Sequence, residues 1–144
     1  IGRLYFKFQM ASFARTLASL LSSGVPIIGA LNMTSKVLGN TLLETALSKA
    51  ARDLTEGSPL SGSLRASGVF PPTLIHMVST GERSGELPAL LIKAADAYEK
   101  EFDSGVARAL TLIEPMMVLA MGAIVGFIVL AILLPIFELN QVIR

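Results

Sequence analysis

Residues 115–137 read PMMVLAMGAIVGFIVLAILLPIF, a run of 23 residues without one charge. A helix rises about 1.5 Å per residue, so this run would form a helix of roughly 34 Å, enough to cross a hydrocarbon core of about 30 Å. Its place near the C-terminal end of the sequence excludes a signal peptide. We therefore predict a transmembrane helix over residues 113–138, followed by a short tail at 139–144.

Charges and glycines around this run bear on its orientation and packing. Of the twelve Lys and Arg residues only Arg144 follows it, and only Lys100 and Arg108 precede it closely enough for the positive-inside rule. They favour a cytoplasmic side for the residues before the run. Inside it, Gly122 and Gly126 form a GxxxG pair, which indicates either a site of close helix packing or the ordinary glycine content of membrane helices.

Composition excludes several classes of function. Of the 144 residues, 52% are hydrophobic and 16% are charged, which is poor in charge for a soluble domain. The formal net charge of +1 provides no basic field for nucleic acid. Without cysteine there is no disulfide or thiolate metal site, and a single histidine, His76, excludes a multi-histidine zinc site.

The first 110 residues show apolar positions at steps of three and four, the period of helices packed on one face. Glycine and proline interrupt the pattern at short intervals, and no segment alternates apolar and polar residues as a strand does. Short connections make consecutive helices antiparallel neighbours. We therefore predict an all-α fold: an antiparallel bundle of about six helices over residues 1–112, the last of which continues into the transmembrane helix.

Two of the helix starts are predicted from local chemistry. Thr41 and Glu44 fit a capping box. Ser58 is placed to cap a helix whose first residue is Pro59.

The segment STGERSGELP, residues 79–88, places two glycines around a Glu-Arg pair before a helical segment. It lacks the Lys and Ser or Thr of a phosphate-binding loop, and its glutamates would repel phosphate. We predict instead a turn in which both glycines adopt backbone angles that a Cβ disfavours, while Glu86 in the next helix interacts with the helix dipole. As a structural corner or a partner-contact site, this segment supplies our candidate site residues: Gly81, Glu82, Arg83, Gly85 and Glu86.

No set of residues converges on catalysis. His76 lies among short apolar residues without a marked nucleophile or a third orienting group. Glu99, Glu101 and Asp103 offer carboxylates, but a helix points alternate residues to different faces, so we expect a solvated surface in place of a metal site. The polar side of the same helix is a second candidate for protein contact, or again an ordinary solvated face: Lys93, Asp96, Lys100 and Asp103.

Four segments carry a resemblance to a known family. They are FARTLASLLSSGVPIIGAL at 13–31, EGSPLSGSL at 56–64, FPPTLIHMVSTGERSGELPALL at 70–91 and IEPMMVLAMGAIVGFIVLAILLPIF at 113–137. In this order and at these separations the chain resembles the inner-membrane platform protein of bacterial type II secretion systems and type IV pili, the protein F or PilC family. That family has two similar cytoplasmic helical domains and three membrane spans, and this chain resembles its C-terminal part.

The resemblance implies a non-enzymatic role without a cofactor or nucleic acid. Family members couple a cytoplasmic secretion ATPase, through other inner-membrane assembly proteins, to the assembly of pilin-like subunits. By similarity, residues 1–112 would be cytoplasmic, residues 139–144 periplasmic, and the protein would contact membrane lipid and further copies of itself. The alternatives are a membrane-anchored enzyme, which would need a convergent active site, and a generic helical transporter subunit, which would show polar residues inside the span.

Overall fold

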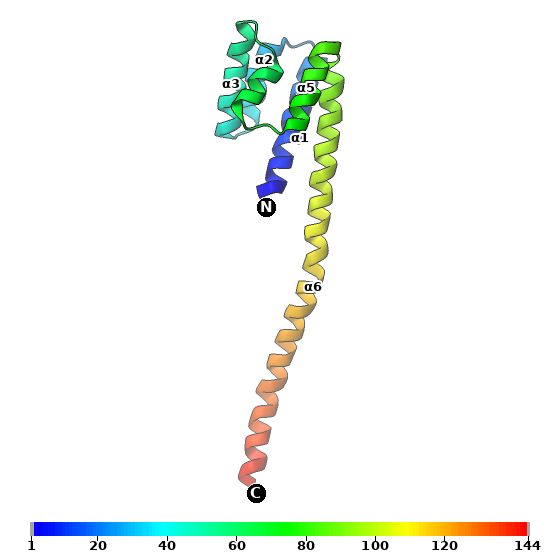
Figure 1. The fold of residues 1–144 in the computed structure, drawn as a ribbon. Coiled ribbons are helices and arrows are strands. Elements are labelled where there is room, and N and C mark those ends of the chain that lie inside the picture. Colours follow the sequence, from blue (N-terminus) through cyan, green and yellow to red (C-terminus); the bar gives the residue numbers. More distant parts are fainter. Residues whose placement is uncertain (1, 144) are drawn as a thin grey trace. The chain divides into compact units, whose positions relative to one another are not determined.

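The computed structural model describes residues 2–143, so Arg144 of the predicted tail lies outside the described residues. Described residues form six α-helices and no strand, which confirms the all-α prediction. Figure 1 shows their order along the chain. The helices are α1 (Gly2–Ser22), α2 (Ile27–Val37), α3 (Thr41–Thr55), α4 (Leu60–Ser67), α5 (Pro72–Ser84) and α6 (Leu87–Ile143).

The chain divides into two compact units, residues 1–103 and residues 104–144, and α6 contributes to both. In the first unit each of the helices α1 to α4 packs on the next one along the chain. The first turns of α6 add Leu87, Leu91, Ala94 and Ala95 to the same hydrophobic core. The periodic apolar positions of the sequence are therefore the ones that meet inside the bundle.

An aromatic pair closes this core between distant parts of the sequence. Phe13 of α1 is fully buried, and its ring centroid lies 5.0 Å from that of Phe70, which precedes α5. Aromatic pairs at this separation stabilise a core beyond the area that they bury. The segment between α4 and α5 is thereby held against the first helix.

The capping residue of α3 differs from the one that we predicted. The capping box at Thr41 is wrong: Thr41 is already the first residue of α3, and the carboxamide oxygen of Asn40 accepts hydrogen bonds from the backbone N–H groups of Leu42 and Leu43, at 2.9 and 3.3 Å. Asn40 therefore performs the capping that we assigned one residue further on.

The start of α4 also lies one residue later than predicted. Pro59 occupies the capping position, α4 begins at Leu60, and the side chain of Ser58 makes no capping hydrogen bond. A proline has no side-chain acceptor for the free N–H groups of the first turn. An acceptor must therefore come from elsewhere in the chain.

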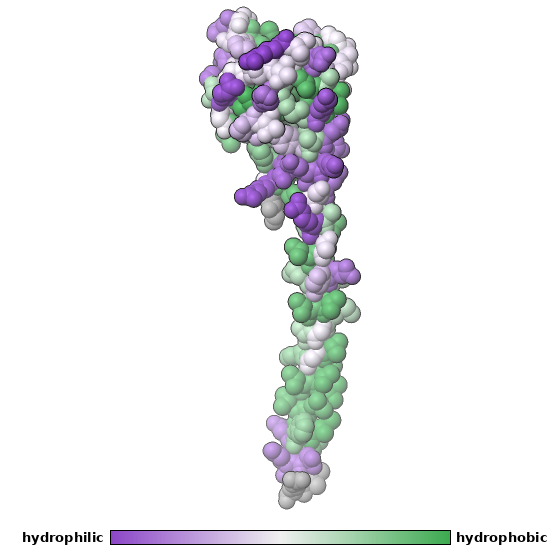
Figure 2. Space-filling view, turned by 45° about the vertical axis from the view of Figure 1, so that its right-hand side comes forward, coloured by the Kyte–Doolittle hydropathy of each residue, from purple (hydrophilic) through white to green (hydrophobic). Residues whose placement is uncertain are grey.

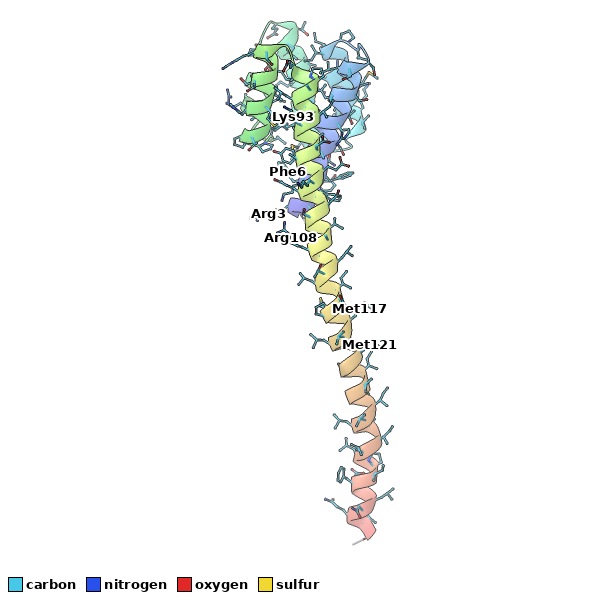
Figure 3. The ribbon with its side chains drawn as sticks, turned by 90° about the vertical axis from the view of Figure 1, so that its right-hand side faces the viewer. Arg3, Phe6, Lys93, Arg108, Met117 and Met121 are labelled. Carbon is cyan, nitrogen blue, oxygen red and sulfur yellow. The ribbon has the colours of Figure 1, made fainter. Side chains whose placement is uncertain are left out.

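The second unit consists of the remaining part of α6. Its apolar side chains are exposed all around the helix, and Leu119 and Phe127 are 73% and 75% exposed. Apolar residues dominate the middle of this segment in Figure 2, with hydrophilic residues towards both ends, and Figure 3 marks Met117 and Met121 on it. By length and composition α6 is able to cross a membrane, and none of its most apolar stretch is buried in the described protein.

Candidate partner-contact site

The predicted corner residues lie at the end of α5, and the helix continues through most of them. We predicted a turn within residues 79–88, but α5 runs to Ser84, and Gly85 ends it in the left-handed conformation with φ of 74°. The backbone N–H of Gly85 donates to the carbonyl oxygen of Gly81, which closes the last turn. The GERSG segment (residues 81–85) is thus the end of α5, and α6 begins two residues after it, at Leu87.

The backbone conformation that we predicted for Gly81 is wrong. Gly81 lies inside the helix and does not adopt a positive φ. A Cβ at this position would lie 2.8 Å from the Cα of Leu87 and 3.0 Å from its Cδ1. Gly81 therefore permits a close approach between α5 and the first residue of α6, and leaves no room for a side chain.

Glu82 provides the acceptor that the start of α4 lacks. Its carboxylate oxygens accept hydrogen bonds from the backbone N–H groups of Leu60 and Ser61, at 2.7 and 2.9 Å. A carboxylate at a helix N-terminus satisfies free N–H groups and also interacts favourably with the helix dipole. This tertiary cap joins α5 to α4, so the Glu82 side chain is directed into the bundle.

Arg83 and Glu86 are both exposed, whereas Gly81 is buried and Glu82 is half-buried. Glu86 acts through its backbone: its N–H donates to the carbonyl oxygen of Gly81 at 3.1 Å, and its carbonyl oxygen accepts from the N–H of Leu90. It precedes the first residue of α6, one position earlier than the first-turn placement that we predicted. Arg83 makes no ion pair with any of the described residues and lines an open pocket on the surface of α5.

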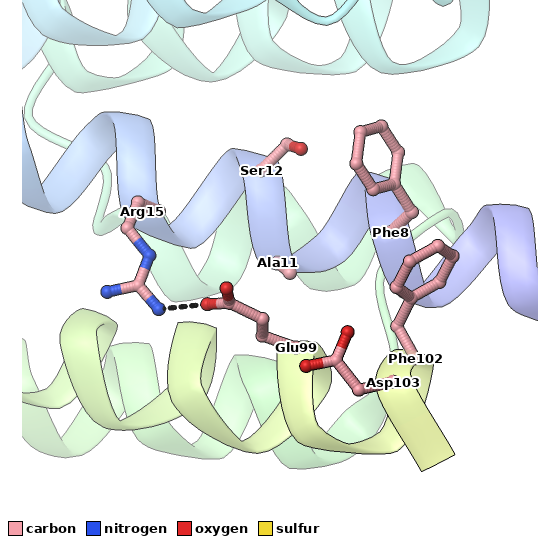
Figure 4. Close-up of a pocket in the computed structure, with 7 residues that line it drawn as sticks. All are labelled: Phe8, Ala11, Ser12, Arg15, Glu99, Phe102 and Asp103. Atoms are coloured by element: carbon pink, nitrogen blue, oxygen red, sulfur yellow. Dashed lines mark hydrogen bonds and ion pairs between the residues drawn. The ribbon is translucent and has the colours of Figure 1, made fainter. Parts of the chain in front are cut away.

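A second polar site lies between α1 and α6 within the first unit (Figure 4). The guanidinium of Arg15 donates to the carboxylate of Asp96 at 2.7 Å and to the carboxylate of Glu99. These hydrogen bonds, first that to Asp96 and then that to Glu99, raise the pKa of Arg15 above its ordinary value. Beside them, the ring centroids of Phe8 and Phe102 are 5.5 Å apart.

Arg15 was absent from our sequence-based candidates. Its partners lie 81 and 84 residues further along the chain, so no local spacing could pair them. The only sign in the sequence of a contact between Arg15 and another helix was its position beside the apolar stripe of the first helix. The sequence analysis did name four residues on the polar side of α6. Of these, Asp96 forms the ion pair with Arg15, and Asp103 lines the polar site between α1 and α6. Lys93 and Lys100 are exposed.

The acidic cluster on α6 has cationic partners. Glu99 pairs with Arg15, and Glu101 lies 3.6 Å from the ammonium group of Lys7. No group of three or more metal-ligating side chains is found within residues 2–143. His76 is exposed on α5, and its carbonyl oxygen accepts a hydrogen bond from the hydroxyl of Thr80.

Gly122 and Gly126 lie in the apolar part of α6. A Cβ added at either position would have no heavy atom within 4 Å beyond the local backbone. The space beside them is therefore open in the described protein, in contrast to the space beside Gly81.

The similarity to known proteins extends over both the bundle and the apolar part of α6. A family model described as type II secretion system protein F matches residues 13–135. The chain belongs to the type II secretion system protein F family. It is 44% identical over 143 residues to the type II secretion system protein F of Pseudomonas aeruginosa, which covers 99% of this chain and 35% of that protein.

Proteins of the same family named for pilus assembly are about as similar. The type IV pilus assembly protein PilC of Pseudomonas aeruginosa is 39% identical over 99% of this chain and 38% of its own length. PilC of Thermus thermophilus is 43% identical over 96% of this chain and 34% of its own length. The chain therefore spans roughly a third of the length of these protein F family relatives.

Proposed function

We propose that this protein is a non-enzymatic, inner-membrane platform component of a type II secretion or type IV pilus machine. The observation that carries the proposal is the family match, which includes both the helical bundle and the apolar part of α6. Relatives named for secretion and for pilus assembly match over nearly the whole chain. In the proposed topology residues 1–112 are cytoplasmic, residues 113–138 cross the membrane, and residues 139–144 are periplasmic.

We further propose that the bundle receives the action of a cytoplasmic ATPase, through assembly proteins of the inner membrane, and that α6 passes it on to pilin-like subunits. Two features support this role for α6. Its first turns are part of the bundle core, and Arg15 ties α1 to Asp96 and Glu99 on the same helix. The same helix also contains the apolar segment, with Pro115 and Pro135 inside it.

Membrane lipid and neighbouring apolar helices are the partners of the second unit in this proposal. Large apolar side chains exposed all around a helix require an apolar solvent. Gly122 and Gly126 are the positions at which a second helix, from another copy or another part of the assembly, would approach most closely.

A test of the proposal changes the helix where the two units meet. Replacing residues 104–107, which read Ser-Gly-Val-Ala, by Gly-Pro-Gly-Gly should interrupt α6, because a proline in a helix interior costs about 3 kcal/mol and each added glycine about 1 kcal/mol relative to alanine. The control replaces the same residues by four alanines, which preserve the helix. We expect the glycine variant to lose protein secretion or pilus assembly in cells, with thermal unfolding of the bundle unchanged, while the alanine variant retains both.

Normal assembly by the glycine variant would contradict coupling through α6. Loss of assembly in both variants would point to a specific need for the native residues at these four positions.

A further inference from the structure

One face of α5 forms an open, basic pocket together with the end of α4. Arg83 and His76 lie on this face of α5, and Arg65 of α4 joins them. Ser79 and Thr80 contribute hydroxyl groups between the two α5 residues. The pocket thus gathers residues from two helices that pack against each other.

The positive charge of the pocket is not neutralised by the described part of the chain. Arg65 and Arg83 are exposed, neither makes an ion pair with a described residue, and no acidic side chain lines the pocket. The nearest glutamate in sequence, Glu82, is excluded because both of its carboxylate oxygens accept hydrogen bonds from the start of α4. The cap that stabilises the bundle therefore leaves the neighbouring arginine without a carboxylate.

The remaining lining suits a protein segment. Pro72 and the buried Ile75 also line the pocket, so it combines apolar and polar groups. Protein interfaces likewise combine apolar and polar groups, and they are enriched in arginine. A guanidinium also binds a carboxylate through two parallel hydrogen bonds, which fixes the orientation of the partner.

A lipid surface fits these observations less well. Membrane surfaces with anionic lipids are recognised by clusters of about four to eight Lys and Arg residues. This pocket has two arginines and one histidine, together with the apolar residues Pro72 and Ile75. A concave site of this kind suits one or two carboxylates on a folded or extended peptide better than a plane of headgroups.

We propose that the Arg65–Arg83 pocket binds an acidic segment of a partner protein, in which at least two Asp or Glu side chains pair with the two arginines. This inference rests on the proposed function, because it specifies the chemistry by which a protein of the machine engages the bundle. Arg83 is the member of the GERSG segment that makes the contact, while Gly81, Glu82 and Gly85 hold the helices that present it.

The test uses the protein in the membrane of cells that carry the whole machine. The photo-crosslinking amino acid benzoylphenylalanine replaces Thr80, which is exposed at the pocket. Crosslinked peptides are identified by mass spectrometry. We expect a crosslink to one partner protein, through a segment that contains closely spaced Asp and Glu residues.

Charge reversal tests the pairing. The double variant Arg65→Glu and Arg83→Glu should reduce this crosslink by at least about tenfold, since two attractive contacts become repulsive. Exchanging the acidic residues of the crosslinked segment for lysine should restore it. The matched control is Arg52→Glu: Arg52 is exposed in the last turn of α3, as the two pocket arginines are in the last turns of their helices, but it lies outside the pocket. This control should leave the crosslink unchanged.

Several results would overturn the proposal. They are a crosslink only to lipid, a crosslink only to another copy of this protein, no crosslink, or a crosslink that survives the double reversal. If such a result occurs while the glycine variant of residues 104–107 still loses assembly, the platform role stands and the docking surface lies elsewhere. If the glycine variant also assembles normally, the proposed coupling through α6 fails as well.

Discussion

Phe13 and Phe127 have the same side chain and lie in two different environments. Phe13 in the bundle is 0% exposed and packs on Phe70, whereas Phe127 in the apolar part of α6 is 75% exposed. In water, a helix buries one apolar face against its neighbours, and the chain satisfies this in the first unit. In the second unit apolar residues surround the helix, so the burial must come from lipid or other proteins.

The two glycine environments show the same contrast. Gly81 is in contact with Leu87 of the next helix, and no side chain would fit there, whereas Gly122 faces open space in the described protein. The contacts that fix the first unit are therefore internal to the chain. The contacts of the second unit must come from lipid or other proteins. Matched substitutions in the two units test this difference.

The largest effect is expected for truncation of the two phenylalanines. Phe13→Ala should lower the free energy of unfolding of the bundle by about 3–5 kcal/mol, because it leaves a cavity in a packed core. Phe127→Ala should leave bundle unfolding unchanged. Thermal unfolding of the detergent-solubilised protein, followed by circular dichroism, measures both. Equal effects would mean that the apolar part of α6 packs on the bundle.

A smaller loss is expected when each glycine receives one methyl group. Gly81→Ala should destabilise the bundle by about 1–3 kcal/mol, because its Cβ requires α5 and α6 to move apart. Gly122→Ala, the matched change in the second unit, should not alter bundle unfolding. Should Gly81→Ala prove stabilising, as alanine is in an unconstrained helix, the close contact with Leu87 would be refuted.

Removal of the tertiary cap should have a moderate effect. Glu82→Ala should cost about 0.5–2 kcal/mol, because the N–H groups of Leu60 and Ser61 lose their acceptor. Glu82→Gln should cost less, since one carbonyl oxygen remains to accept. The neighbouring change Arg83→Ala serves as the control, and denaturant unfolding ranks the three variants. A cost for Arg83→Ala as large as that for Glu82→Ala would argue against the cap.

The smallest effect is expected for the ion pairs of Arg15. Arg15→Met should destabilise the bundle by about 0.2–1 kcal/mol, because the guanidinium and both carboxylates are largely exposed and screened by water. Since salt screens exposed charges further, the difference from the parent protein should shrink in 1 M salt, where the Debye length is about 3 Å. A difference that is independent of salt would contradict a screened, exposed ion pair at Arg15.

Patterns confined to one helix were predictable, and contacts between helices were not. The all-α class, the buried stripe of α1 and the apolar run of α6 follow from periodicity and length, which are properties of consecutive residues. The acceptor for the start of α4 lies 22 residues away at Glu82, so Ser58 was the only capping residue that the local sequence offered. Gly81 was read as a turn residue for the same reason, because its neighbour Leu87 is set by packing and not by spacing.

The candidate site shows the same limit. The GERSG segment was identified from the sequence, but its division into residues that hold the bundle and one exposed arginine required side-chain positions. Arg65 and His76 join Arg83 only through the packing of α4 on α5. Nothing in the linear sequence associates them.

The contrast between the two environments is tested most directly by the accessibility of single cysteines. The sequence contains no cysteine, so each introduced thiol reports one position. Lys93→Cys in the bundle and Met121→Cys in the apolar part of α6 (Figure 3) are compared in membrane vesicles that expose the cytoplasmic side, with a membrane-impermeant maleimide. We expect Lys93→Cys to react and Met121→Cys to remain unlabelled until detergent and denaturant are added. Equal labelling of the two positions in intact vesicles would place Met121 in water and contradict the account.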